Sequence, residues 1–78
     1  MATLVFLGRL ADVAGAPQLE AEPGPLAEVL ARLPGELAIA LLDERVRIAH
    51  NGVLIGEPEA LMLAAGDEVA FLPPVSGG

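Results

Sequence analysis

The last six residues of the chain, 73–78, offer the plainest chemistry in the sequence. They read Pro-Pro-Val-Ser-Gly-Gly and follow an apolar segment. A frayed terminus is the simplest interpretation, but the two prolines fix φ and remove two backbone donors, which disfavours pairing as a sheet strand. Fully extended, such a segment spans about 20 Å at most, enough for a terminal carboxylate to enter a pocket on another protein. Gly77 and Gly78 lack Cβ atoms, so this tail is slim.

A carboxylate at Gly78 has one obvious reaction. The pKa of an α-carboxyl is about 3.3–3.7, so the group is ionised at neutral pH and is a poor electrophile until it is activated. Adenylation would supply that activation. The sequence therefore points to a protein whose terminus is the reacting group.

Residues 66–78 resemble a known family. Gly-Asp-Glu-Val-Ala-Phe-Leu at 66–72, followed by Pro-Pro-Val-Ser-Gly-Gly, closely resembles the end of molybdopterin synthase small subunits. These are sulfur carriers of the MoaD/ThiS ubiquitin-like family. The final Pro-Pro-Val-Ser-Gly-Gly is the most specific part of the match, and in length and element order the resemblance extends over nearly the whole chain.

The resemblance implies a mechanism for the terminus. In that family an E1-like activating enzyme uses ATP to form a transient acyl-adenylate on the terminal glycine, here Gly78, and a sulfur donor protein then supplies the sulfur of a thiocarboxylate. The tail inserts into the large subunit of molybdopterin synthase and gives its sulfur to a pterin precursor in molybdenum cofactor biosynthesis. The small subunit is no enzyme alone and holds no permanent cofactor. Because this chain has no cysteine, it cannot carry sulfur as a persulfide, which leaves the terminal carboxyl.

The resemblance also assigns residues to partner contacts. Gly77 would thread through the partner beside Gly78. The implied partner-binding residues are Pro73, Pro74, Val75, Ser76, Phe71 and Arg9. Small subunits often carry an arginine in the loop after the first strand, at the position of Ala11 here, and Arg9 is the candidate replacement.

Other functions use the same terminus, and the residues alone do not separate them. Val75 and Ser76 favour molybdopterin through the resemblance. The same thiocarboxylate would also serve thiazole synthesis or tRNA thiolation, and a ubiquitin-like modifier would be conjugated to lysines through Gly78. A purely structural binding module would leave the two final glycines unexplained.

Composition indicates a small intracellular protein. Its 78 residues form one domain, which we divide into a β-grasp domain at 1–72 and a flexible C-terminal tail at 73–78. It has no cysteine and is 54% hydrophobic, yet its longest apolar runs are far too short to cross a bilayer. The first apolar run precedes Arg9 and follows no basic region, which does not fit a signal peptide. We therefore expect a cytoplasmic protein that does not bind membranes.

Acidic residues dominate the charge. The chain has 11 acidic residues, four arginines and no lysine, for a formal net charge of -7. Such a surface repels phosphate backbones, so nucleic acid is a poor partner. The acidity serves either solubility or steering towards basic partner surfaces.

Other reactive side chains are interpreted as structural. His50 is the only histidine, so a structural or solvated role is favoured over a metal or catalytic one. The pairs Asp43-Glu44 and Asp67-Glu68 stand at element boundaries and are typical of solvated turns. The sequence contains no phosphate-binding loop, nucleophilic cysteine or metal-ligand spacing, so we expect no catalysis by the chain alone.

Hydrophobic periodicity predicts the first half of the fold. A continuous apolar run at 3–7 predicts a central strand buried on both faces, and alternation at 18–22 predicts an edge strand paired with it. Residues 9–17 are interpreted as a loop, with room for one helical turn. A helix is predicted from Pro25, which suits the first helical position. Its core-facing residues are Leu26, Val29, Leu30 and Leu33, which we expect to pack against Val5, Val69 and Phe71.

The second half is predicted as a short helix, a hairpin and a last strand. Residues 36–43 are interpreted as a helix, with a buried strand as the alternative. Residues 46–50 and 53–55 should form a hairpin around Asn51-Gly52, a strong turn signal. Residues 68–72 should form the last strand, parallel to the first in the middle of the sheet. The predicted fold class is α+β, a ubiquitin-like β-grasp with a mixed sheet packed on one face by a helix.

Overall fold

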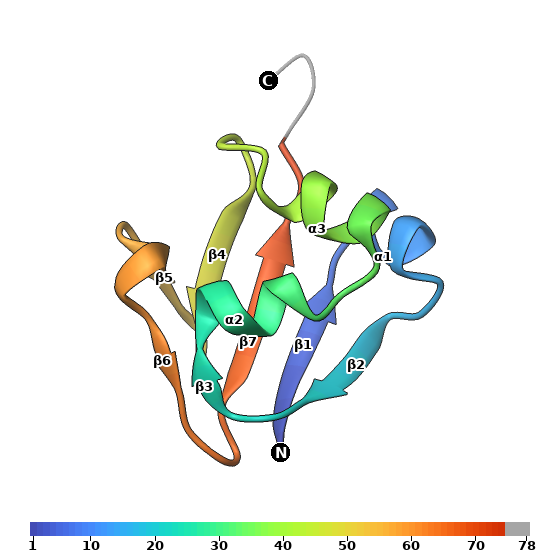
Figure 1. The fold of residues 1–78 in the computed structure, drawn as a ribbon. Helices are drawn as coiled ribbons and strands as arrows, with labels where there is room; N and C mark the ends of the chain where they lie inside the picture. The colour runs from blue at the N-terminus through green and yellow to red at the C-terminus, as the bar shows by residue number, and fades with distance from the viewer. Residues whose placement is uncertain (75–78) are drawn as a thin grey trace.

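The computed structural model describes residues 1–74, which form a mixed sheet with the helices on one of its faces (Figure 1). In chain order the elements are β1 (Ala2–Phe6), α1 (Arg9–Ala14), β2 (Gln18–Ala21), β3 (Gly24–Pro25), α2 (Leu26–Ala31), α3 (Gly35–Leu41), β4 (Arg47–His50), β5 (Val53–Ile55), the 3-10 helix η1 (Pro58–Ala60), β6 (Met62–Leu63) and β7 (Glu68–Leu72).

The main sheet has five strands in the order β2-β1-β7-β4-β5. The first and last strands are parallel neighbours, with Leu4 opposite Val69 and Phe6 opposite Phe71. β2 pairs antiparallel with β1 at one edge, and β4 pairs antiparallel with the other side of β7. The predicted central parallel pair is thus confirmed, and β7 is the middle strand.

The core lies between the helices and one face of the sheet. Its buried side chains include Leu4, Phe6, Leu10, Val29, Leu30, Leu37, Leu41, Val69 and Phe71. The prediction that β1 is buried on both faces is wrong. Thr3 and Val5 are only half-buried, because successive side chains of a strand point to opposite faces and no helix within residues 1–74 covers the second face. The buried side chains of α2 therefore share the core with Leu4 and Phe6 of β1. Val5, which was expected to contact this helix, is not part of the core.

Three details of the helices differ from the sequence predictions. The segment expected to be a loop contains α1, which buries Leu10 and ends at Gly15 with φ 78°. Pro25 is extended, with ψ 136°, and pairs with Met62, so the helix begins one residue later. The helix also ends before Leu33, which packs against the core from the following turn. The second short helix, α3, is confirmed.

The hairpin between β4 and β5 is confirmed. Asn51 and Gly52 both have positive φ, 49° and 87°, as a two-residue turn of this hand requires. None of the helices within residues 1–74 is long and apolar enough to cross a membrane.

Candidate functional site at the end of the central strand

The end of β7 is held on both sides. Leu7 N donates to Phe71 O at 3.1 Å, and on the other side Arg47 is the register partner of Leu72. Below them the Phe6 and Phe71 rings stack with centroids 5.7 Å apart and an interplanar angle of 15°. The last residue of the strand therefore has a fixed position and direction, at the end of the sheet opposite the N-terminus (Figure 1).

The placement of Phe71 corrects one sequence assignment. The resemblance placed this residue among the partner-binding side chains, but its side chain is 0% exposed and belongs to the core. Phe71 faces the helices because it alternates with Ala70 and Leu72, which are half-buried. Its contribution to the site is to fix the strand end.

Pro73 continues from the strand against Gly8. A β-carbon at position 8 would stand 3.0 Å from Pro73 Cγ, and Gly8 also has φ 55°. Gly8 precedes α1 directly, so the start of this helix and the exit of the chain share one tight contact. Both the backbone angle and the close approach favour glycine here.

Pro74 lies beside a shallow hollow of about 310 Å³. Arg9, from the first turn of α1, and Asp43, which follows α3, line this hollow, and Leu10, Val13 and Val46 supply apolar surface. Asp12 of α1 also lines the hollow, so the chain leaves the domain over a small apolar surface bordered by one cation and two carboxylates.

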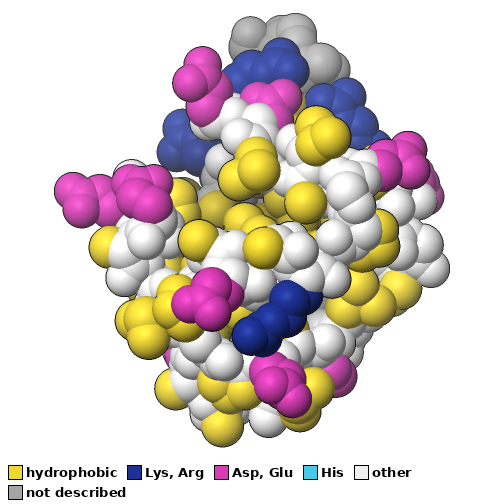
Figure 2. Space-filling view, viewed as in Figure 1, with side chains coloured by type: hydrophobic (Ala, Val, Ile, Leu, Met, Phe, Trp, Pro, Cys, Tyr) yellow, Lys and Arg dark blue, Asp and Glu magenta, His cyan; other side chains and the backbone are white. Residues whose placement is uncertain are grey.

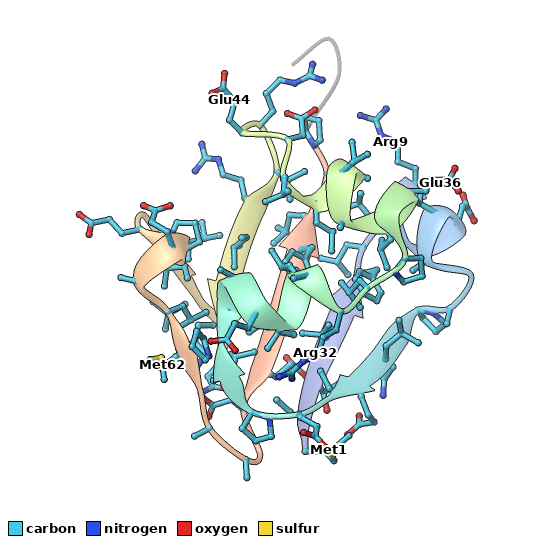
Figure 3. The ribbon with its side chains drawn as sticks, in the orientation of Figure 1. Met1, Arg9, Arg32, Glu36, Glu44 and Met62 are labelled. Atoms are coloured by element: carbon cyan, nitrogen blue, oxygen red, sulfur yellow. The ribbon has the colours of Figure 1, made fainter. Side chains whose placement is uncertain are left out.

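Three of the four arginines lie around this exit. Arg9 lines the same hollow as Pro74, Arg45 is bound to Asp43 of that hollow, and Arg47 is opposite Leu72. All three are exposed. Figure 2 shows dark blue side chains gathered at this end, and Figure 3 shows Arg9 and Glu44 at the same end while Arg32 lies lower on the helix face. A protein with a net charge of -7 thus concentrates its cations where the chain leaves the sheet.

Asp43 and Arg45 hold the turn before β4 in place. Arg45 Nη2 donates to Asp43 Oδ2 at 2.9 Å, and Arg45 N donates to Asp43 Oδ1 at 2.9 Å. The hydrogen bonds from Arg45 lower the pKa of Asp43 from 3.8 to about 2, and Asp43 in turn raises the pKa of Arg45. The sequence analysis interpreted Asp43-Glu44 as a solvated turn. It did not predict that Arg45 binds Asp43 and so stabilises this turn.

The structure brings together some of the residues assigned from sequence. Pro73, Pro74 and Arg9 meet at the exit, with Phe71 beneath them. Ala11, which occupies the position of the family arginine, is half-buried against the core. Arg9 lies in the first turn of the same helix, and its side chain is exposed and accessible to a partner. The remaining assigned residues, Val75, Ser76, Gly77 and Gly78, lie outside the described residues.

His50 belongs to a separate cluster at the start of β7. Its Nε2 atom lies 2.9 Å from Asp67 Oδ2, Asn51 Nδ2 donates to Asp67 Oδ1 at 3.3 Å, and Asn51 Oδ1 accepts from Glu68 N at 2.8 Å. These contacts tie the β4–β5 turn to the turn before β7. The cluster stands at the opposite end of β7 from the chain exit, and its role is structural.

Residues 4–78 match the sequence model of the ThiS family. The chain belongs to the ThiS family. This match covers the described exit and the tail beyond it. Against proteins of curated function, no sequence match is found.

Solved structures with the same fold agree with membership of the ThiS family. CysO from Mycobacterium tuberculosis has a TM-score of 0.78 and 23% identity, covering 96% of this chain and 100% of that chain. SAMP1 from Haloferax volcanii has a TM-score of 0.70 and 25% identity, and the match covers 99% of this chain and 98% of that chain. A chain of the complex of subunits 1 and 2 of molybdopterin-converting factor from Helicobacter pylori has a TM-score of 0.65 and 24% identity, and the match covers 99% of this chain and 97% of that chain. The fold is the ubiquitin-like β-grasp.

Proposed function

We propose that this ThiS-family chain is a sulfur carrier whose reactive group is a thiocarboxylate on Gly78. The observation that supports it best is the end of β7. The strand is paired with β1 up to Phe71 and with β4 up to Leu72, and the chain then leaves the sheet at Pro73 and Pro74 towards the Gly-Gly ending. The pairing of the strand fixes the point from which the terminus is presented to a partner, and the two prolines restrict φ at the start of the tail.

The proposed chemistry takes place in two steps on partner enzymes. A carboxylate oxygen of Gly78 attacks the α-phosphorus of ATP, pyrophosphate leaves, and an acyl-adenylate forms. In the second step the outer sulfur of a persulfide on a sulfur donor protein attacks the acyl carbon, the bond from that carbon to the AMP oxygen breaks, and AMP leaves with one of the original carboxyl oxygens. A thiol of the donor protein then cleaves the S–S bond of the resulting acyl disulfide, which gives the thiocarboxylate and leaves the donor as a disulfide. The chain supplies the acyl group, while an E1-like activating enzyme supplies the nucleotide site.

The exit residues would orient the domain on these partners. Arg9 and Arg47 are exposed on either side of the strand end, where carboxylates around a partner's tail channel could pair with them. Pro73 and Pro74 donate no backbone hydrogen bond, so the tail is free to separate from the sheet.

The proposed acceptor is a pterin precursor in molybdopterin synthase, with its large subunit as the partner. The resemblance to the small subunits in the Pro-Pro-Val-Ser-Gly-Gly ending supports this choice over thiazole or tRNA thiolation. A chain of the Helicobacter pylori molybdopterin-converting factor has the same fold, which is consistent with this choice.

A protein-modifier function is the second candidate. It is favoured by the similarity to SAMP1, the small archaeal modifier protein 1 of Haloferax volcanii. In that case the activated Gly78 would be attacked by a lysine amine of a target, and an isopeptide bond would form. The chain has no lysine of its own, so each target amine would receive a single copy.

Sulfur loading in vitro tests the carrier proposal. The chain is incubated with the activating enzyme, ATP and a sulfur donor, and its intact mass is measured. We expect a mass increase equal to the exchange of one oxygen for sulfur. Deletion of Gly78, or one alanine appended after it, should abolish the increase, while Gly56→Ala, a change outside the tail in open space, should not.

The acceptor is identified in the same assay after adding the large subunit and the pterin precursor. Molybdopterin formation supports the full proposal. Normal molybdopterin formation with a blocked terminus would refute it. If the loaded chain gives its sulfur only to thiazole or tRNA, or forms lysine conjugates, the reactive terminus is retained and the assigned acceptor is wrong.

A further inference from the structure

A second hollow lies on the helix-covered side of the molecule, between α2, the end of α3, β4 and η1. It has a volume of about 380 Å³, and we call it the helix-face groove. Its inner lining is apolar and comprises Leu26, Leu30, Leu41, Val46, Ile48 and Pro58. Figure 2, which views this face, shows hydrophobic side chains around the middle of the helix layer.

Large apolar side chains stand exposed at the border of the groove. Leu42, which lines it, is 68% exposed, and Ile39 on the same helical segment is 74% exposed. Leu42 also lines a neighbouring apolar hollow with Ala31 and Ala38. The two hollows share Ala27, Leu30 and Leu42 and so form one apolar surface, of the kind that marks an interaction site when it has a polar rim.

The rim of the helix-face groove is acidic. Asp43, Glu44 and Glu59 line it, and no arginine does. Arg45 is paired with Asp43 and also interacts electrostatically with Glu44, whereas Glu59 makes no ion pair with any residue in the described part of the chain. Three carboxylates against one arginine leave the rim with a net negative charge, which favours a partner with basic groups around an apolar centre.

We propose that the helix-face groove binds a basic amphipathic segment of a partner protein. Apolar side chains of that segment would cover Leu42 and fill the groove, and its arginines or lysines would face Glu44 and Glu59. This is the arrangement by which an amphipathic helix docks into an apolar groove. The inference stands apart from the sulfur chemistry, because none of the lining residues belongs to the tail.

A small polar ligand fits this groove less well than a peptide does. Binding sites for small molecules place a few polar groups inside an apolar cavity to orient the ligand. Within residues 1–74 no polar or charged side chain is buried, and the carboxylates of the groove stand only at its rim. Carboxylates at the rim can pair with positively charged side chains that are spaced along a peptide.

The groove adjoins the chain exit but contains neither Pro73 nor Pro74. Asp43 and Val46 line both the helix-face groove and the hollow beside Pro74. A segment bound in the groove would thus lie next to the exit and contact two residues that also border the hollow beside Pro74.

Selection from a random 12-residue peptide library tests the proposal. The full chain is immobilised, and enriched peptides are measured against Leu42→Lys and the matched control Val53→Lys. The exposed fractions of Leu42 and Val53 are 68% and 65%, and each substitution adds one positive charge. Val53 lies on β5, outside the groove. Thermal unfolding first verifies that both variants are folded.

We expect enriched peptides to carry basic residues flanking apolar ones and to bind Leu42→Lys about tenfold more weakly than Val53→Lys. NMR shift changes should map to Ala27, Leu42 and Glu59. Equal loss of affinity in both variants would assign the binding to net charge and overturn the proposal. The proposal would also be overturned by shifts confined to the open face of the sheet, or by a library that yields no specific peptide.

Discussion

Gly8 and Pro73 lie so close that a β-carbon at position 8 would stand 3.0 Å from Pro73 Cγ. This contact couples the first turn of α1 to the residue at which the chain leaves the sheet. The position of Arg9, the residue after Gly8, and the direction of the exit are consequently set by the same packing.

Gly8→Ala should destabilise the domain by about 1–3 kcal/mol, because the alanine would have a strained positive φ and would also press on Pro73. Denaturant unfolding measures the change. Gly15→Ala is the comparison, because Gly15 also has positive φ, 78°, but has nothing within 4 Å of a β-carbon. Its ψ of 9° differs from the -136° of Gly8, so a double-mutant cycle of Gly8→Ala with Pro73→Ala separates the contact from the backbone strain. Additive losses in this cycle would show that the contact with Pro73 has no energetic effect.

Leu30→Ala should cost about 2–5 kcal/mol, because Leu30 is buried between α2 and the sheet and its truncation leaves a cavity. Leu42→Ala, at an exposed leucine, should change stability by about 0.5 kcal/mol or less. Chemical denaturation of both variants gives the comparison. Equal effects would mean that the buried stripe of α2 has been assigned to the wrong residues.

Local signals in the sequence were sufficient to predict β7 and the hairpin. The Gly66-Asp67 turn and the proline at 73 limit the last strand to the residues observed, and Asn51-Gly52 sets the turn between β4 and β5. Pro25 was misassigned because its fixed φ suits either the first helical position or an extended residue. In the structure Pro25 is extended because it pairs with Met62 of β6.

The site depends on contacts that no local pattern contains. The position of Arg47 opposite Leu72 follows from the register between β4 and β7, and a shift by one residue would move it to the other face. The burial of Phe71 likewise follows from which face of the sheet the helices cover. The resemblance placed Phe71 among the partner-binding residues, and no local pattern in the sequence shows which face of the sheet its side chain occupies.

Asp67 should make stability depend on pH in the acidic range. The hydrogen bond from Ala64 N, followed by those of His50 and Asn51, lowers the pKa of Asp67 from 3.8 to about 2. The folded state therefore binds this proton more weakly than the unfolded chain does. The resulting stabilisation is present above pH 3.8 and is lost as the pH falls towards about 2.

The Asp67→Asn variant tests this pH dependence in urea unfolding at several pH values. Compared with the wild type, it should be less stable at neutral pH and should lose less stability between pH 3.8 and 2. Asp12→Asn is the control, because Asp12 accepts no side-chain hydrogen bond from residues 1–74. If both variants show the wild-type slope in this range, Asp67 does not contribute to acid unfolding.

Arg47→Glu should weaken binding to the activating enzyme or the large subunit, because it reverses a charge next to the strand end that presents the tail. Arg47 is exposed and paired in register with Leu72, so the change affects the partner surface and not the core. A rim charge of this kind acts mainly on the association rate, and we expect a loss of about three- to tenfold that shrinks as salt is added. Arg32→Glu makes the same change in net charge at an exposed arginine away from the exit and should leave the rate within about twofold of the wild type. Stopped-flow association at two ionic strengths distinguishes the two variants. If Arg32→Glu slows association as much as Arg47→Glu does, the total charge of the domain governs the encounter and the arginines at the exit have no specific part in it.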